Sequence, residues 1–388
     1  MPIFYSFCLI LRIHFLQLIN INKYKLEIKL YFCQHQKMKI LRLLLFPFSI
    51  GYGFVVIMRN LAYDLGLFKS QSFDLPVISI GNLSVGGSGK SPMAEYLVRL
   101  LKVHYKIATL SRGYGRKTSG FLIVNTDSES AESGDEPLQF KHKFNDITVA
   151  VCEDRVEGIN RLKQDNELII LDDAFQHRAV KPGLSLLLFE YSTLFKQQWL
   201  LPTGDLREPM WAIDRADLVV VTKCPEKLGM DQQNTIRSRF RTDKVFFSFL
   251  KYGTLISFNE TTIERSLKSL NEKSKIILLT GIANAAPLHA ELSSYGSKLI
   301  HHQYPDHHQF SDKNIAKLVS AFNELSGHDN LIITTEKDAQ RLVMPGIREQ
   351  LKEFPVYYLP VEAEFKEPEK TRFNKLIGDY ASKFTDNN

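Results

Sequence analysis

From residue 75 onward, the hydrophobic residues of this chain form short apolar runs that alternate with segments of helical spacing. Strands buried on both faces read as continuous apolar runs, and helices between them cover a parallel sheet. Residues 93–102 have the spacing of an amphipathic helix. The pattern therefore predicts an α/β domain over residues 66–230. Its predicted strands are residues 75–80, 107–111, 147–151, 168–173, 184–190 and 216–223.

A second series of apolar runs begins at residue 275. The chain between residues 226 and 275 is more polar, and residues 246–258 suggest extended, hairpin-like structure. We therefore expect a β-rich connector over residues 231–274 and a smaller C-terminal α/β domain over residues 275–388. The strands predicted for this domain are residues 275–283, 297–304, 330–336 and 355–361.

The segment 43–58 is apolar and uncharged, with Arg42 before it and Arg59 after it. It is shorter than the roughly 20 residues that a spanning helix needs. A helix within residues 38–65 that lies in the membrane surface, with its cations on lipid phosphates, fits this pattern better. A buried core helix is the alternative.

Residues 1–37 follow neither a helical nor a strand period and lack the cleavage site of a signal peptide. We expect them to be an extension outside the native protein, with Met38 as the natural start.

Composition places the chain among globular proteins, because 44% of its 388 residues are hydrophobic and 24% are charged. The net charge of +6 suits a partner that carries phosphates or an anionic membrane surface. The four cysteines are scattered, which favours reduced thiols over a disulfide framework. They are Cys8, Cys33, Cys152 and Cys224.

The strongest chemical signal is the segment SVGGSGKS, which follows the first predicted strand and precedes a predicted helix. A phosphate-binding loop needs this context, because free N–H groups and the helix dipole then meet the anion. Lys90 would reach the β and γ phosphates and Ser91 would ligate Mg²⁺, whereas Ser84 replaces the usual first glycine. The residues predicted to bind nucleotide are Ser84, Val85, Gly86, Gly87, Ser88, Gly89, Lys90 and Ser91.

A second acidic group supports this interpretation. The apolar run 168–173 ends in Asp172 and Asp173, the form of a strand whose carboxylate holds Mg²⁺. Residues 221–226 lack the Asn and Asp with which a GTPase would recognise guanine. ATP and Mg²⁺ are therefore the expected cofactors.

Other polar clusters allow more than one interpretation. Arg112 and Arg116 follow a predicted strand and suit an anionic substrate, although a solvated basic loop is the alternative. Asp135 begins a predicted helix, where helix capping would also explain it. The histidine-rich segment 301–312 fits a single proton carrier better than a zinc site.

Eight motifs, in order, resemble those of the tetraacyldisaccharide 4′-kinase family. They are GNLSVGGSGKSP (81–92), SRGYGRK (111–117), GDEP (134–137), DDAFQH (172–177), LPTGDLREP (201–209), LTGIAN (279–284), YPDHHQF (304–310) and TEKDA (335–339). The resemblance covers residues 38–365 and departs from the family at Ala174, which is usually glycine, and at Asp205, which occupies a variable position.

The resemblance implies a P-loop NTPase-like kinase that uses ATP and Mg²⁺ to phosphorylate the 4′-hydroxyl of a tetraacylated glucosamine disaccharide 1-phosphate. It further implies action at the cytoplasmic face of the inner membrane, against its phospholipid surface, without nucleic acid or an obligate protein partner.

The resemblance also implies roles for individual residues. By this likeness Asp172 and Glu208 lie around Mg²⁺, Arg207 neutralises developing charge, and Asp135 with His307 acts on the acceptor hydroxyl. Asp173, Gln176 and His177 would line the same cleft and contact substrate.

Two other classes of function remain open on the residues alone. One is a P-loop ATPase or GTPase that acts as a chaperone and hydrolyses nucleotide without a lipid acceptor. The other is a nucleotide-gated membrane scaffold that needs no turnover.

Overall fold

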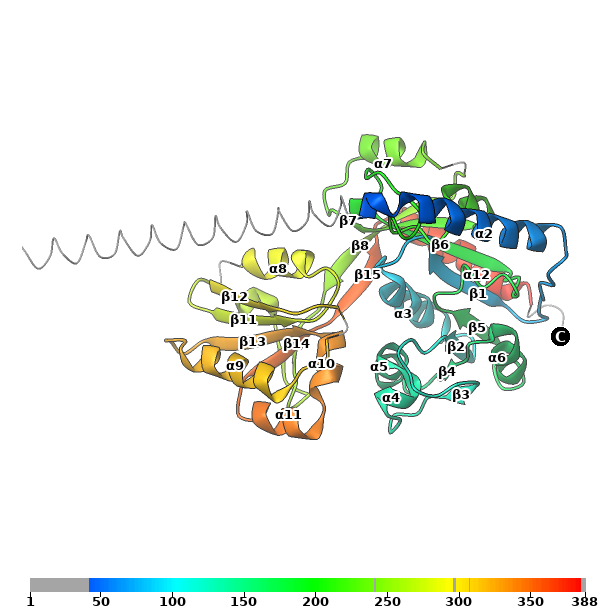
Figure 1. Ribbon diagram of the computed structural model, residues 1–388. Coiled ribbons are helices and arrows are strands. Elements are labelled where there is room, and N and C mark those ends of the chain that lie inside the picture. The colour runs from blue at the N-terminus through cyan, green and yellow to red at the C-terminus, as the bar shows by residue number, and fades with distance from the viewer. Residues whose placement is uncertain (1–41, 241, 296–297, 307, 385–388) are drawn as a thin grey trace, which may run out of the picture. The chain divides into compact units, whose positions relative to one another are not determined.

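A computed structural model describes residues 42–384 except 241, 296–297 and 307 (Figure 1). The chain divides into two units, of which the larger comprises residues 61–196 and 210–388. The described part of the smaller unit consists of residues 42–60 and 197–209. The predicted extension 1–37 lies outside the described residues.

A nine-stranded sheet carries the phosphate-loop motif in the larger unit, counted over the described residues. The order of its strands is β15-β8-β7-β6-β1-β5-β2-β4-β3. Only the outer pairs β3–β4 and β15–β8 are antiparallel, so the predicted parallel core is confirmed. The strands are β1 (Val77–Asn82), β2 (Ile107–Ser111), β3 (Leu122–Ile123), β4 (Thr148–Val151), β5 (Leu168–Leu171), β6 (Leu184–Glu190), β7 (Leu218–Cys224), β8 (Val245–Tyr252) and β15 (Val361–Phe365).

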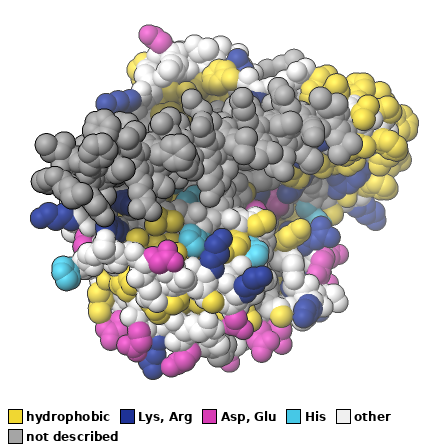
Figure 2. Space-filling model, turned by 60° about the vertical axis from the view of Figure 1, so that its left-hand side comes forward, with side chains coloured by type: hydrophobic (Ala, Val, Ile, Leu, Met, Phe, Trp, Pro, Cys, Tyr) yellow, Lys and Arg dark blue, Asp and Glu magenta, His cyan; other side chains and the backbone are white. Residues whose placement is uncertain are grey.

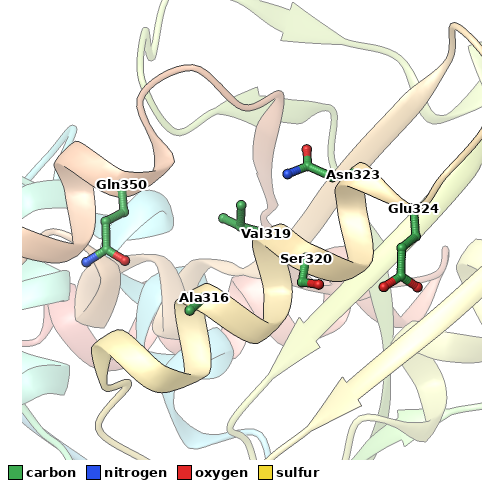
Figure 3. A pocket seen from close by; sticks show the side chains of 6 residues that line it. All are labelled: Ala316, Val319, Ser320, Asn323, Glu324 and Gln350. Atoms are coloured by element: carbon green, nitrogen blue, oxygen red, sulfur yellow. The ribbon is translucent and has the colours of Figure 1, made fainter.

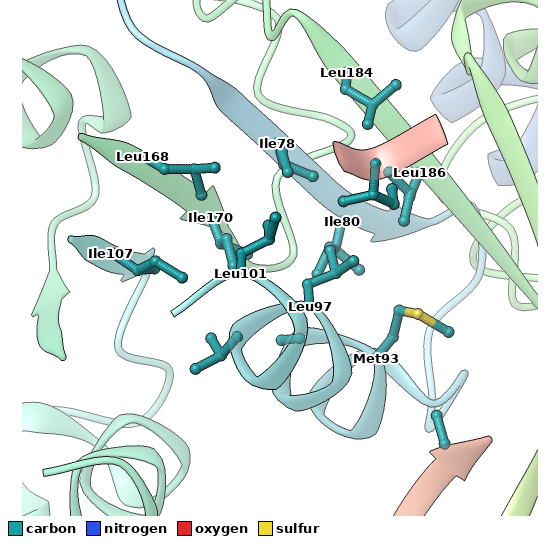
Figure 4. Packing of buried hydrophobic residues seen from close by; sticks show 14 of the residues in the cluster. Ile78, Ile80, Met93, Leu97, Leu101, Ile107, Leu168, Ile170, Leu184 and Leu186 are labelled. Carbon is teal, nitrogen blue, oxygen red and sulfur yellow. The ribbon is translucent and has the colours of Figure 1, made fainter. Parts of the chain in front are cut away.

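Both faces of this sheet are covered by helices because its strands are apolar on both sides. Ile78 and Ile80 of β1 pack in the cluster that holds the apolar stripe of α3, formed by Met93, Leu97 and Leu101 (Figure 4). Helix α6 packs on the other face of the sheet, against Val77 of β1 and against apolar residues of β2, β4 and β5. The helices of this part are α3 (Lys90–Leu101), α4 (Ser130–Ser133), α5 (Asp135–Lys143), α6 (Arg155–Leu162), α7 (Met230–Arg237) and α12 (Glu369–Ser382), with short 3-10 turns at Tyr191–Thr193 and Met210–Arg215.

A six-stranded sheet forms the rest of the larger unit, in the order β10-β9-β14-β13-β11-β12 among the described strands. Neighbouring strands among β14, β13, β11 and β12 are parallel. Strand β9 pairs antiparallel with β14, and β10 pairs antiparallel with β9. Helices α8 and α9 pack against opposite faces. The elements are β9 (Leu255–Ser257), β10 (Glu264–Arg265), β11 (Lys275–Thr280), β12 (Lys298–Gln303), β13 (Asn330–Thr335), β14 (Val356–Leu359), α8 (Ala286–Ser293), α9 (Asp312–Asn323), α10 (Glu336–Leu342), α11 (Pro345–Leu351) and a 3-10 turn at Leu267–Ser269.

The structure differs from the sequence interpretation in how the two sheets exchange strands. Residues 246–258 do not form a hairpin, because β8 pairs with β7 and β15 while β9 pairs with β14 and β10. The C-terminal strand β15 and helix α12 return to the nine-stranded sheet instead of completing the smaller domain. Tyr380 of α12 fixes this return, since its hydroxyl exchanges hydrogen bonds with the backbone N–H and C=O of Val77.

The smaller unit contains most of helix α2 (Phe46–Asp64) and the loop 197–209. Pro47 is tolerated because it lies in the first helical turn, where no intrahelical N–H bond is lost. Ser49 and Gly53 form the buried face of α2, and large apolar side chains elsewhere on the helix are exposed. None of the helices within the described residues has the length and apolar character needed to cross a membrane.

Charge and hydrophobicity are unevenly distributed over the surface. On the face drawn in Figure 2, hydrophobic side chains gather at the upper right of the view, and acidic and basic side chains are interspersed below.

Candidate active site

The segment 84–91 joins a buried strand to a helix, as a phosphate-binding loop must. Strand β1 ends at Asn82 and α3 begins at Lys90. Gly86 and Gly89 have φ values of 111° and 82°, a region that favours glycine. Ser84 is absent from the residues with positive φ, so the entrance of the loop does not require a glycine. The backbone therefore has the form that the motif predicts.

Lys90 reaches back over the loop toward the ends of neighbouring strands. Its Nζ donates to Asn82 Oδ1 at 3.1 Å and lies 3.5 Å from Asp173 Oδ1. Asp173 itself has a φ of 48°, which is strained for a residue with a side chain. An ammonium group held between an amide and a carboxylate can exchange these partners for phosphate oxygens.

Asp172 follows β5, the strand hydrogen-bonded to β1. Its Oδ1 atom is buried and has no hydrogen-bond partner among the described residues. Burial, with additional repulsion from Glu136 and Asp173, raises the pKa of Asp172 to about 7, and Lys90 opposes this shift. An unsatisfied buried carboxylate oxygen is the kind of group that a cation would complete.

These donors fit Mg²⁺ bound together with a nucleotide. Mg²⁺ in such sites takes one or two protein oxygens and shares the phosphate oxygens of the substrate. Asp172 supplies a carboxylate, and Ser91 supplies a hydroxyl from the first turn of α3. No cluster of three His, Cys, Asp or Glu side chains that could hold a metal occurs in the described part of the chain. Ser91 and Asp172 as ligands of a nucleotide-bound Mg²⁺ therefore stay a prediction.

The segment 172–177 supports the end of β1. Gln176 Nε2 donates to Asn82 O at 2.9 Å, and the His177 N–H donates to Ala174 O. Gly81 is required here, because a Cβ atom would lie 2.6 Å from Phe175 Cβ. Ala174 has no positive φ, so the departure from the family's glycine causes no backbone strain.

The end of β7 also holds the loop, which the sequence did not reveal. Thr222 Oγ1 donates to Ser88 O at 2.8 Å, and Lys223 Nζ donates to Gly87 O. Lys223 has a φ of 54° and lies 3.3 Å from Glu190. The sequence of residues 221–226 carries no signal of this contact, because the contact depends on β7 ending beside the phosphate loop.

Arg116 and Arg112 differ in their surroundings. The Arg116 guanidinium is nearly buried, donates to Glu153 Oε1 at 2.6 Å and also donates to Gly120 O. These contacts hold the loop after β2, while Nη1 of Arg116 is buried without a hydrogen-bond partner among the described residues, and the role of Arg116 at a substrate stays a prediction. Arg112 is exposed, and its contact with an anionic substrate stays a prediction.

Arg155 is a buried cation that sequence reasoning missed. It begins α6, and its Nη1 donates to Cys152 O at 3.0 Å. Burial lowers the pKa of the Arg155 guanidinium, and attraction from Asp172 and Asp173 opposes that shift. The available signal was an arginine four residues after the predicted strand 147–151.

Asp135 is the first residue of α5, and its carboxylate has two partners among the described residues. Ser130 Oγ donates to Asp135 Oδ1, and Arg341 Nε donates to Oδ2 at 3.3 Å. His307 lies outside the described residues, so the pair of Asp135 with His307 stays a prediction. Capping is not the role of Asp135, because α5 follows Gly134 with no side-chain cap.

Arg207 and Glu208 belong to the smaller unit, where helix α2 shapes their loop. Ser49 Oγ donates to Leu200 O and Thr203 Oγ1, and Tyr52 Oη donates to Arg207 O at 2.9 Å. Glu208 is buried, and its charge helps burial to raise the pKa of Tyr52. Their proposed roles at phosphate and Mg²⁺ stay predictions.

A surface hollow of about 600 Å³ lies away from these groups, between α9 and α11 (Figure 3). None of the described site residues lines it, and Glu324 supplies the charge among its lining side chains. Its lining residues are Ala316, Val319, Ser320, Asn323, Glu324 and Gln350.

Comparison with known proteins is decisive. A family model described as tetraacyldisaccharide-1-P 4′-kinase matches residues 41–379. The chain belongs to this family. It is 42% identical over 359 residues to the tetraacyldisaccharide 4′-kinase of Bacteroides thetaiotaomicron, covering 88% of this chain and 94% of the relative. It is 43% identical over 359 residues to the enzyme of that name from Flavobacterium psychrophilum, covering 90% and 100%.

A solved structure of the family shares the fold. LpxK from Aquifex aeolicus, in complex with ATP, is 31% identical with a TM-score of 0.68, covering 88% of this chain and 99% of that one. The predicted P-loop NTPase-like fold is therefore confirmed. The family relationship favours a kinase over the chaperone and scaffold alternatives.

Proposed function

We propose that this protein is an ATP-dependent tetraacyldisaccharide 4′-kinase, which transfers the γ-phosphate of ATP to a lipid disaccharide and makes lipid IVA in lipid A biosynthesis. The observation that carries the proposal is Lys90 at the start of α3, with its Nζ 3.5 Å from Asp173 Oδ1, next to the buried carboxylate of Asp172 that follows β5. Family membership supplies the acceptor, since the relatives are named for the 4′-hydroxyl of a tetraacyldisaccharide.

Phosphoryl transfer depends mainly on positioning and on neutralising charge on the phosphates. The N–H groups of residues 86–91 and the α3 dipole would bind the phosphates, and Lys90 would hold the β and γ oxygens. Mg²⁺, held by Ser91 and Asp172, would supply further positive charge there. Arg207 would stabilise charge that develops during transfer, and Glu208 would complete the metal site.

The acceptor side needs a base and contacts for the lipid phosphate. Asp135 would take the proton of the 4′-hydroxyl, and His307 would act with it. Arg112 is exposed and basic, which suits the 1-phosphate of the acceptor. Asp173, Gln176 and His177 would line the space between the nucleotide and the sugar.

Helix α2 would bring the enzyme to its lipid at the cytoplasmic face of the inner membrane. Its exposed side chains include Phe48, Ile50, Phe54, Val55 and Leu61. Such an apolar face, on a helix that does not combine the length and apolar character needed to cross a bilayer, favours binding in the membrane surface.

One assay tests the reaction. Purified protein is incubated with γ-labelled ATP, Mg²⁺ and the tetraacyldisaccharide 1-phosphate in mixed micelles, and lipid and free phosphate are separated. Label in the lipid, absent with an acceptor whose 4′-hydroxyl is replaced by hydrogen, supports the kinase. Label only in free phosphate would indicate an ATPase, and no release of label would indicate a scaffold.

A further inference from the structure

The segments 279–284 and 335–339 have no role in the reaction as proposed, yet they meet in the structure. They follow β11 and β13, which are adjacent parallel strands, so both segments lie at the same edge of the six-stranded sheet. Asp338 is fully buried there. Its Oδ2 accepts from the Gly281 N–H at 2.9 Å and from Thr335 Oγ1 at 2.8 Å.

This network holds one arginine. Arg341 lies one turn after Asp338 on α10, and its side chain is 1% exposed. Its Nη1 donates to Asp338 Oδ1 at 2.8 Å and to Gly281 O at 3.0 Å. These two hydrogen bonds hold the planar guanidinium in one orientation, and this orientation sets the direction of its Nε–H.

The Nε–H of Arg341 is directed at Asp135. It donates to Oδ2 at 3.3 Å, while Ser130 Oγ donates to Oδ1. Both oxygens of Asp135 are therefore held, one from α4 and one from α10. An adjacent pair, Lys337 with Glu136 at 2.8 Å, is more exposed and has a flexible ammonium group.

We propose that Arg341 is a positioning residue for Asp135 in phosphoryl transfer. The proposal rests on the proposed function, in which Asp135 accepts the proton of the acceptor hydroxyl. A general base must be ionised and must point at its proton. The guanidinium fixes the plane of the carboxylate, and the segments 279–284 and 335–339 fix the guanidinium. The alternative is that Arg341 only stabilises the fold.

A double-mutant cycle separates these two roles. Arg341→Lys keeps a cation but loses the planar guanidinium that hydrogen-bonds Asp338 and Asp135 at the same time. Arg341→Gln is a second variant, to be used if the Arg341→Lys protein does not fold. We expect kcat to fall by about 10- to 100-fold with the KM for ATP unchanged, as for residues that orient a reacting group. Asp135→Asn alone should lower kcat by about 10²- to 10⁴-fold. Lys337→Gln is the matched control on the same helix and should keep kcat near that of the wild type.

The decisive measurement is kcat of the Asp135→Asn/Arg341→Lys double variant, by single-turnover transfer of label to lipid. If Arg341 acts through Asp135, the double variant equals Asp135→Asn within about twofold, since residues that act as a unit are not additive. A further 10- to 100-fold loss would show a role independent of Asp135 and overturn the inference. Full activity of Asp135→Asn would overturn it as well, while label in lipid from the wild type would leave the kinase assignment intact. Failure of the wild type to label lipid would instead defeat the proposed function.

Discussion

Lys90 is the residue whose removal should affect nucleotide most directly. Its Nζ lies 3.1 Å from Asn82 Oδ1 and 3.5 Å from Asp173 Oδ1, so alanine removes a positive charge that would bind the γ-phosphate. We expect Lys90→Ala to lower kcat/KM for ATP by about 10²- to 10³-fold, the usual loss when one preorganised donor to developing charge is removed. Steady-state kinetics measures kcat/KM for ATP, and nucleotide titration measures the affinity for ATP.

The control lies on the same stretch of chain. Lys102 follows α3 and pairs with Asp146 at 2.8 Å in a solvated position. Lys102→Ala should leave kcat/KM within about twofold of the wild type, because exposed pairs contribute little. Equal losses in the two variants would contradict the assignment of Lys90.

Cys224 should be chemically inert in the folded protein. Burial raises the pKa of its thiol to about 12, compared with a usual value of 9.0. Only the thiolate reacts, so at pH 8 alkylation should be about 10³-fold slower than for an unperturbed thiol. The rate should continue to rise tenfold per pH unit beyond pH 9 instead of levelling off. Peptide mapping after brief iodoacetamide treatment measures this at Cys224, and rapid native labelling at pH 8 would contradict it.

The residues around the phosphates could be predicted because their geometry is local. A glycine-rich turn between a strand and a helix needs no distant partner, so residues 84–91 were identified from spacing alone. Arg116 could not be interpreted in this way, because Glu153 lies 37 positions away and decides whether the guanidinium is free. The Arg341–Asp135 contact joins residues 206 positions apart and left no periodic signal.

At the scale of single elements, α2 shows what a sequence pattern can and cannot specify. Its length and apolar character predicted a helix, and its small residues Ser49 and Gly53 are four positions apart. Only the structure shows that these two face the loop 197–209, where a Cβ on Gly53 would lie 2.8 Å from Leu200 Cδ1. The alternative of a fully buried core helix is wrong, because most large side chains of α2 are exposed.

The exposed face of α2 should bind lipid. Phe54 is 63% exposed and lies beside buried Gly53, so Phe54→Glu changes the surface without touching the loop. Inserting a Phe side chain in an apolar phase is worth about 1.5–3 kcal/mol. We therefore expect the variant to bind vesicles of phosphatidylethanolamine and phosphatidylglycerol about 10- to 100-fold more weakly.

Co-sedimentation of protein with these vesicles measures the effect. Val103→Glu is the control, because Val103 is an exposed apolar residue that does not belong to α2. It makes the same change of charge and should leave binding unaltered. Equal losses in the two variants would mean that net charge, and not the apolar face of α2, governs association.

At the scale of the whole chain, the alternation of strands and helices predicted two parallel sheets but not how the chain passes between them. Strands β8 and β15 pair with each other in one sheet, while β9 and β14 pair in the other. The two connections therefore run together, and Gly253 N–H donates to Pro360 O at 3.0 Å. Strands that pair across more than 100 positions of sequence, such as β8 and β15, find each other through the packed core. Apolar runs predict that such strands exist but not which of them pair.

Lys143 joins the helices of both sheets in the larger unit. Its Nζ lies 2.8 Å from Glu95 on α3 and 2.7 Å from Glu336 on α10. Burial opposes the charge of Lys143, but the two carboxylates together raise its pKa. Burial also raises the pKa of Glu95, and the nearby carboxylate of Glu336 adds to this shift, while Lys143 and Arg99 oppose it. Lys143 is therefore expected to hold α3, which carries the phosphate loop, and α10, which carries Arg341.

Replacing Lys143 by Met should destabilise the protein strongly and in a pH-dependent way. Two partly buried carboxylates lose their common cation, and Glu95 keeps Arg99 at 2.9 Å. We expect a loss of about 2–4 kcal/mol at pH 8, near the 3–5 kcal/mol typical of a broken buried pair. The loss should be smaller at pH 5, because the raised pKa of Glu95 lets it take up a proton as the pH falls and removes one unpaired charge. Urea denaturation at the two pH values measures this, with Lys102→Met as the exposed control at about 0–1 kcal/mol. A Lys143→Met loss that matches the control, or one that is the same at both pH values, would show that this ion-pair cluster does not couple the two helices.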